Sequence, residues 1–264
     1  MIDVSDLNPE KIKTSLKSSV IGSEILVFGE VASTNDLARD RLAKNSPEGL
    51  TVVADSQTRG RGRLGRAWRS APGLGLYFSV LLRPRLDARR LPLLALMASV
   101  AVADAIGEFA GATKLKWPND VLLNGKKTCG ILAEYCKTES SEGVVVGIGV
   151  NVNHRLDQLP EEFRSAATSL FIENGGPVNR AEVLRSILER LDAEYRDFLS
   201  HGEELLVEKW TERTDMFGKQ ITVTRGPASF RGTAMGLDRS GNLAVLTEDG
   251  RRLSFESGEV TLNG

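Results

Sequence analysis

An arginine- and glycine-rich segment between two strand-like segments places the strongest limit on how this chain folds. In residues 57–68, QTRGRGRLGRAW, four arginines and three glycines fall within the eight positions from Arg59 to Arg66. Residues 50–56 before it and 74–82 after it have the composition of strands. The segment is therefore predicted to be the long charged loop of a β-hairpin.

The composition of this loop indicates an anion-binding site. Glycine lets backbone N–H groups approach a ligand closely, and a guanidinium group can hold two phosphate oxygens at once. Trp68 supplies a flat ring that can stack on a base or cover the site. The alternative is a solvated charged turn with no function, because exposed charge runs are common.

Two known glycine-loop folds are excluded by what surrounds this loop. Gly60, Gly62 and Gly65 satisfy G-x-G-x-x-G, but a dinucleotide-binding turn opens a helix, whereas here Pro72 and Gly73 precede a strand. A protein-kinase loop does join two strands, but neither H-R-D nor D-F-G occurs in the 264 residues.

Composition and charge indicate an ordinary globular protein with a local anion site. Lys+Arg total 34 against Asp+Glu 35, a net charge of −1, which does not favour binding to nucleic acid through the overall field. Cys129 and Cys136 are an odd number of positions apart, so on one strand they point to opposite faces and form no local disulfide or metal pair. The first residues lack a signal-peptide pattern, and a cytoplasmic location is expected.

The first part of the chain predicts an alternation of helices and strands. A short helix is expected in residues 9–17, a strand in 24–28, and a helix in 35–44 that Ser33 or Thr34 caps. Three small polar side chains at positions 33–35 either form a simple cap or point hydrogen-bonding groups into a cavity. Residues 91–110 are apolar on nearly all sides and are predicted to be a helix buried against a sheet.

A second stretch rich in turn and strand signals runs from Leu115 to Cys136. W-P-N-D at 117–120 is predicted to be a turn, and Asn124-Gly125 a tight hairpin turn into a strand that starts at Lys127. Residues 143–153, GVVVGIGVNVN, form another strand, where two central glycines allow the close approach of a ligand or backbone.

The C-terminal part changes from helices to short strands. A helix capped by Asn179 and a second helix in residues 203–214 are followed, from Gly218, by short strands separated by turns. The expected fold class is α+β: a mixed β-sheet catalytic domain packed with helices (24–215), preceded by an extension (1–23) and followed by a small SH3-like β-barrel (216–264).

Four motifs in this order, GRGRLGRAW, KWPND, KTCGILAE and GIGVNVN, resemble those of the biotin protein ligases, also called biotin–[acetyl-CoA carboxylase] ligases. The resemblance covers about residues 24–264. It implies an enzyme that uses Mg-ATP to activate biotin as biotinyl-5′-AMP and then transfers it to one lysine of a biotin carboxyl carrier protein. With only 23 residues before the first strand, the monofunctional type without a DNA-binding domain is expected.

The resemblance also implies roles for individual residues. Lys127, Arg63 and Asp120 are the expected catalytic residues. The residues expected to bind biotin are Ser33, Thr34, Asn35, Gln57, Arg61, Gly62, Arg63 and Lys127. Those expected to bind the nucleotide are Arg61, Arg63, Arg66, Trp68, Asn119 and Asn151. Asp120 is the expected Mg²⁺ ligand, or alternatively it deprotonates or orients the acceptor lysine.

Two other functions remain open from the sequence. A lipoate or octanoate ligase or transferase of the related group shares the architecture, and a non-catalytic nucleotide or nucleic-acid binder would use the same loop and bind with a steep salt dependence. The expected partners are biotin, ATP and the carrier protein, with no DNA and no membrane. A homodimer formed by edge-to-edge sheet pairing is compatible with a β-rich domain.

Overall fold

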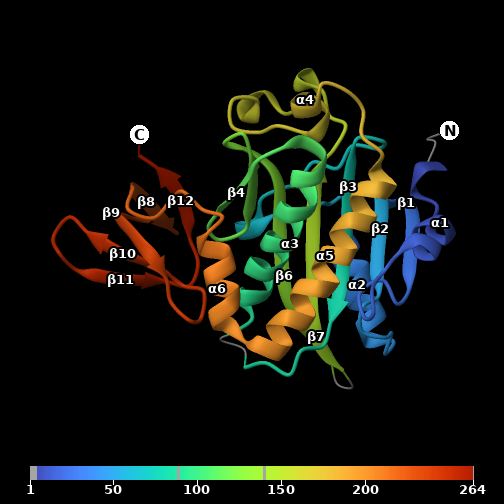
Figure 1. The fold of residues 1–264 in the computed structure, drawn as a ribbon, viewed down its shortest axis with the longest axis horizontal. Helices are drawn as coiled ribbons and strands as arrows, with labels where there is room; N and C mark the ends of the chain where they lie inside the picture. The colour runs from blue at the N-terminus through green and yellow to red at the C-terminus, as the bar shows by residue number, and fades with distance from the viewer. Residues whose placement is uncertain (1–4, 88–89, 139–140, 264) are drawn as a thin grey trace.

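The computed structural model describes residues 5–87, 90–138 and 141–263. The larger of its two β-sheets is mixed and has seven strands (Figure 1). The strand order is β1-β2-β3-β7-β6-β5-β4, with β1 and β2 parallel and all other neighbours antiparallel. Its strands are β1 (Ile25–Val31), β2 (Thr51–Gln57), β3 (Gly75–Leu82), β4 (Thr113–Lys116), β5 (Asp120–Leu123), β6 (Lys126–Lys137) and β7 (Glu142–Asn151).

Helices cover both faces of this sheet. The α-helices are α1 (Pro9–Ser15), α2 (Thr34–Ala43), α3 (Pro92–Ala110), α4 (Leu170–Asn174), α5 (Arg180–His201) and α6 (Glu203–Thr211), and short 3₁₀ turns lie at Ser5–Leu7, Arg63–Gly65, Leu156–Gln158 and Glu161–Phe163. In Figure 1, α3 and α5 cross in front of the sheet. The predicted hairpin of β2 and β3 is confirmed by their antiparallel pairing.

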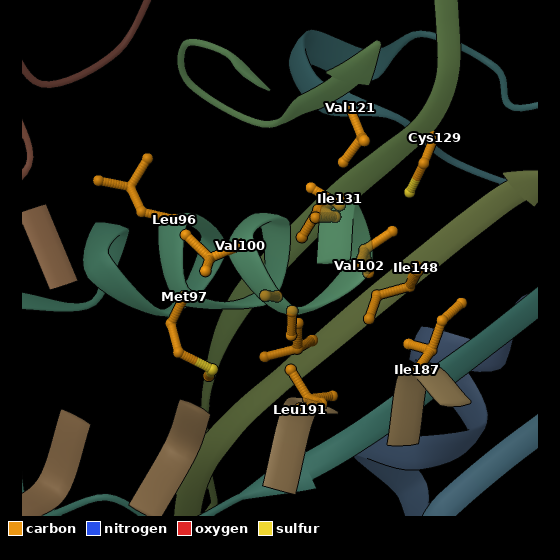
Figure 2. Close-up of a cluster of buried hydrophobic side chains, with 14 of the residues drawn as sticks. Leu96, Met97, Val100, Val102, Val121, Cys129, Ile131, Ile148, Ile187 and Leu191 are labelled. Carbon is orange, nitrogen blue, oxygen red and sulfur yellow. The ribbon is translucent and has the colours of Figure 1, made fainter. Parts of the chain in front are cut away.

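The main core lies between the sheet and the helices α3 and α5. Figure 2 shows side chains of α3, such as Met97 and Val100, meeting Ile131 and Ile148 of the sheet and Leu191 of α5. Helix α3 is long and apolar enough to cross a membrane by length and composition alone, but most of it is buried in this core. The expected buried helix is therefore confirmed.

The opposite face of the sheet packs on α2. Val144 and Val146 belong to the main core, whereas Val145 between them joins a second cluster with Ala38 and Leu42 of α2. This alternation follows from the two-residue period of a strand. Cys129 lies in the first cluster and Cys136 in the second, so the expected placement of the two free cysteines on opposite faces is confirmed.

A buried ion network fixes the base of the β2–β3 hairpin to α5. Arg180 is 2% exposed and donates to Asp55 at 2.5 Å and to the carbonyl of Gly75 at 3.2 Å. Asp55 also accepts the backbone N–H of Gly73, and Asp6 pairs with the other side of Arg180. The charged loop thus projects from a rigid base.

The C-terminal residues form a separate five-stranded antiparallel sheet, which Figure 1 shows beside α6. Its order is β11-β10-β9-β8-β12, and its strands are β8 (Gln220–Arg225), β9 (Ala228–Leu237), β10 (Leu243–Thr247), β11 (Arg252–Phe255) and β12 (Glu259–Leu262). Within the described residues, β11 and β12 pair only with β10 and β8 and not with each other. The predicted C-terminal β-domain is therefore confirmed as an antiparallel sheet, in which both end strands are only four residues long and the sheet does not close on itself.

Candidate functional site

Three glycines leave the face of the sheet beside α2 without side chains at its centre. Gly130 of β6 lies opposite Gly149 of β7, and Gly147 lies two residues before Gly149. A Cβ at Gly149 would lie 2.5 Å from the ring of Trp68, and one at Gly147 would lie 2.1 Å from Asn35 Oδ1. Real Cβ atoms essentially never approach other atoms so closely, so these three glycines form a floor on which Trp68 and Asn35 lie only because the floor has no side chains.

The charged loop folds back over this floor as an irregular extension of the β2–β3 hairpin. Isolated antiparallel bridges join Gln57 to Ser70 and Arg61 to Ala67. At the turn, Leu64 has a positive φ of 56° and is 68% exposed. The loop therefore presents its apolar tip to solvent and turns Trp68 inward.

Trp68 and Lys127 meet at the floor. The Lys127 ammonium lies 5.6 Å from the centroid of the Trp68 ring and forms an ion pair with Asp120 at 2.6 Å. The indole Nε1 of Trp68 is buried and has no hydrogen-bond partner within the described residues. A flat ring, an ammonium group and a carboxylate thus converge beside Gly130.

Two of the three predicted phosphate-binding arginines, Arg61 and Arg66, form ion pairs with carboxylates of this chain. Arg61 binds Asp36 through both guanidinium ends, at 2.7 and 2.8 Å, and hydrogen bonding from Arg61 lowers the pKa of Asp36 despite partial burial. Arg66 binds Glu259 of β12 in the same way, at 2.5 and 2.6 Å, and lowers its pKa.

Arg63 is held differently from its two neighbours. One guanidinium nitrogen donates to Asn119 Oδ1 at 3.2 Å and to the carbonyl of Gly258 at 3.3 Å. Burial lowers the pKa of Arg63, since the charged form loses solvation. A partly buried guanidinium that has no carboxylate hydrogen-bond partner among the described residues is suited to bind an incoming anion.

The start of α2 forms a second polar wall. Ser33 caps the helix, and Thr34 donates its backbone N–H and hydroxyl to Gln57 Oε1 at 2.8 and 3.2 Å. Ser79 of β3 donates to Asn35 Oδ1 at 2.6 Å, while the Asn35 amide donates to Glu134 at 2.6 Å. The amide of Asn35 is thus occupied by the protein, and Thr34 and Gln57 are linked directly.

Two further predicted residues lie at the end of the floor nearest to Lys127. Asn119 donates to the carbonyl of Ile131 at 2.7 Å, and Asn151 donates to the carbonyl of Thr168 at 3.0 Å. The structure therefore brings the predicted residues of the β2–β3 loop, the α2 start, β5, β6 and β7 to one face of the sheet.

Two predicted residues of the loop are held by contacts outside the floor. Arg66 lies at the rim and pairs with Glu259 of the C-terminal sheet. Gly62 has an extended backbone, and its N–H donates to the carbonyl of Arg66.

Sequence reasoning missed the acidic partners of the site. None of Asp36, Glu134 and Glu259 had an expected role in the site. Glu134 follows G-I-L-A on β6, and alternation from Gly130 places it on the floor side of the strand. That alternation was a usable signal, whereas nothing local marks Glu259 as a partner of the loop.

Two models of known protein families match this chain. The model of the Biotin/lipoate A/B protein ligase family matches residues 27–151, and that of the Biotin protein ligase C terminal domain matches residues 216–262. The fold and the site thus define a protein of the biotin and lipoate ligase class.

Individual relatives distinguish biotin ligases from lipoate ligases within this class. A bifunctional ligase/repressor of Bacillus subtilis is 39% identical over 92% of this chain and 76% of its own length. A biotin–[acetyl-CoA-carboxylase] ligase of Mycobacterium tuberculosis is 30% identical over 98% of both chains. The structure of an Aquifex aeolicus biotin protein ligase in complex with biotin and ATP superposes with a TM-score of 0.79 at 35% identity, covering 91% of this chain and 99% of that one. The chain belongs to the biotin protein ligase family.

Proposed function

We propose that this protein is a ligase that activates biotin with ATP as biotinyl-5′-AMP and transfers the biotinyl group to a specific lysine of a biotin carboxyl carrier protein. The observation that carries the proposal is the arginine loop folded over the glycine floor, with Lys127 at its inner edge. The relatives described above, one of them solved with biotin and ATP, support the same substrates.

In the first step, a carboxylate oxygen of biotin attacks the α-phosphorus of ATP, the bond to the bridging oxygen breaks, and pyrophosphate leaves. The reacting groups are both anions, so fixed positive charge lowers the barrier. Lys127 and Arg63 supply that charge at the floor. Arg61 and Arg66 hold phosphate oxygens from the loop, while Trp68 packs on the nucleotide side.

In the second step, the amine of the carrier lysine attacks the acyl carbon, AMP leaves, and the amine loses a proton. Asp120 lies 2.6 Å from Lys127 and is the carboxylate placed to orient or deprotonate the incoming amine. The closed loop over the floor limits access of water to the adenylate, which hydrolyses easily. Thr34 and Gln57 bind the ureido end of biotin.

Mg²⁺ is the expected companion of ATP. Across the described ranges, no group of three His, Cys, Asp or Glu side chains is arranged to hold a metal ion. Mg²⁺ with a nucleotide usually takes only one or two carboxylates besides phosphate oxygens and water, so a single acid fits this donor set. As the alternative to its role toward the acceptor amine, Asp120 would hold the ion, which when bound neutralises phosphate charge, with Asn119 and Asn151 nearby on the nucleotide side.

Several organisational features belong to the same proposal. We place the catalytic domain at 24–215 and the C-terminal domain at 216–264, and interpret the latter as an open form of the SH3-like barrel. The position of β1 at one edge of the seven-stranded sheet supports an edge-to-edge homodimer. The net charge of −1 supports a protein that does not bind DNA, and a cytoplasmic location is proposed with it.

Transfer to a carrier tests the proposal. The protein is incubated with Mg-ATP, biotin and the carrier domain of a bacterial acetyl-CoA carboxylase, and the carrier is analysed by mass spectrometry. We expect one biotinyl group per carrier and none when the acceptor lysine is replaced by arginine. A carrier that remains unmodified, or that is modified equally after this replacement, would contradict the proposed function.

A further inference from the structure

Four charged side chains form a closed network at the start of α2. Arg61 from the loop donates to both oxygens of Asp36, and its NH2 also lies 3.6 Å from Glu134 Oε2. Arg39, one turn further along α2, lies 3.2 Å from Asp36 Oδ1 and 3.3 Å from Glu134 Oε1. Two carboxylates and two guanidinium groups thus alternate, and their charges balance.

The two arginines differ in where they are anchored. Arg39 belongs to a regular helix and donates through Nε to the buried Cys136, so its place is fixed by β6 and α2 together. Arg61 belongs to the loop, beside glycines on both sides. Arg39 is therefore the better anchored of the two arginines, and Arg61 lies on the more adaptable backbone.

The contacts of Arg61 have a direct consequence for ligand binding. A guanidinium fork that holds both oxygens of Asp36 uses two of its five N–H groups and cannot present that two-pronged edge to a phosphate at the same time. An incoming phosphate competes with Asp36 and Glu134 for the same fork. The side chains of Arg61, Asp36 and Glu134 are 35%, 32% and 27% exposed, so the exchange takes place at a surface that solvent and ligand reach.

Arg39 makes the exchange feasible. Once Arg61 turns to a phosphate, Asp36 and Glu134 stay close together and near a polyanion, which is unfavourable for uncompensated charges. Because the two terminal nitrogens of Arg39 each contact one of these carboxylates, both keep a counter-charge. The same arrangement also leaves the Asn35–Glu134 hydrogen bond in place.

We propose that Asp36 and Glu134 are positioning residues that hold Arg61 in the ligand-free protein and release it to the phosphates of the nucleotide, while Arg39 remains as their counter-charge. This exchange rests on the proposed function only in that the ligand is a nucleotide phosphate. The proposal predicts that removing the Asp36 carboxylate and removing the Arg39 guanidinium change the affinity for ATP in opposite directions.

Equilibrium binding of Mg-ATP without any acid substrate tests the exchange. Asp36→Asn keeps the shape of the side chain but weakens the competitor for Arg61, so ATP should bind about two- to fivefold more tightly, the range of a partly exposed ion pair. Arg39→Gln leaves two carboxylates uncompensated, so ATP should bind about two- to fivefold more weakly.

Two controls separate this effect from general loss of structure. Asp40→Asn removes an exposed acid of the same helix, and Asp40 forms no ion pair in the described part of the chain. This variant should bind ATP with the affinity of the unaltered protein. The double variant Asp36→Asn with Arg39→Gln should return close to that affinity, because the two charge changes cancel.

The signs of the two single-variant effects decide the outcome. Weaker or unchanged ATP binding in Asp36→Asn, or unchanged binding in Arg39→Gln, would overturn the proposal. Because this readout needs no biotin and no carrier, it remains decisive even if the protein activates another acid. Failure of biotin transfer and failure of the exchange are therefore distinguishable.

Discussion

Gly149→Ala tests whether the glycine floor positions the catalytic loop. A Cβ at this position would lie 2.5 Å from Cε2 and Nε1 of Trp68, whereas ordinary contacts begin at about 3.5 Å. The indole must therefore move by about 1 Å. A displacement of this size in a positioning group costs on the order of 100-fold in rate, or about 2.7 kcal/mol of transition-state stabilisation.

The folded state should tolerate the same change. Gly149 lies in a strand without a positive φ, so alanine meets no backbone strain and reduces the entropy of the unfolded chain by up to about 1 kcal/mol. Trp68 belongs to a partly exposed loop that can lift. Stability to urea should thus stay within about 1 kcal/mol of that of the unaltered protein.

The assay is kcat/KM for biotin-dependent pyrophosphate release, together with acrylamide quenching of tryptophan fluorescence. Trp117 and Trp210 are buried, so increased quenching reports on Trp68. Gly29→Ala is the matched control, because a Cβ at Gly29 of β1 meets no atom within 4 Å. A Gly149→Ala rate within threefold of the Gly29→Ala rate would refute the reasoning.

Four further predictions follow from the contacts of the site and core. Arg63→Lys should release biotinyl-AMP about tenfold faster, measured as leakage of the adenylate, since a point charge replaces a fork and loses about 1.5 kcal/mol; unchanged leakage would contradict this role. Lys127→Ala should slow adenylation by about 100-fold or more at unchanged Tm, and a near-normal pyrophosphate burst would exclude the role. Glu259→Gln should cost less than about 1 kcal/mol in urea unfolding, and nothing at high salt, because Arg66 and Glu259 are both well exposed. His154 is 5% exposed, and burial lowers its pKa from 6.5 to about 4. The unfolded chain therefore binds more protons between these values, and stability should fall by up to about 3 kcal/mol as pH drops from 6.5 to 4, a slope that His154→Gln removes.

Local patterns predicted most of the secondary structure. The cap at Asn179 gave the start of the helix α5, and the apolar stretch at 91–110 gave α3 to within one residue. Such features depend on neighbours within a few positions. The strand β4 was missed because Thr113–Lys116 has only four residues and no clear alternation.

The long-range part of the site was less predictable. The two glycines of β7 predicted a close approach, but not that Asn35 and Trp68 are the side chains that approach. Arg66 and Glu259 are 193 positions apart, and no local signal links them. Whether short terminal strands close a barrel or remain edges likewise depends on tertiary packing, so the sequence predicted the C-terminal strands but not how far their sheet closes.

Pyrophosphate release from Mg-ATP, measured without a carrier and with biotin, lipoate or octanoate as the acid, tests the central claim most directly. The arrangement of the arginine loop, the glycine floor and Lys127 predicts release that depends on biotin alone. Release with lipoate or octanoate instead would assign the site to a different acyl substrate. Absence of release with all three acids would contradict an adenylating enzyme.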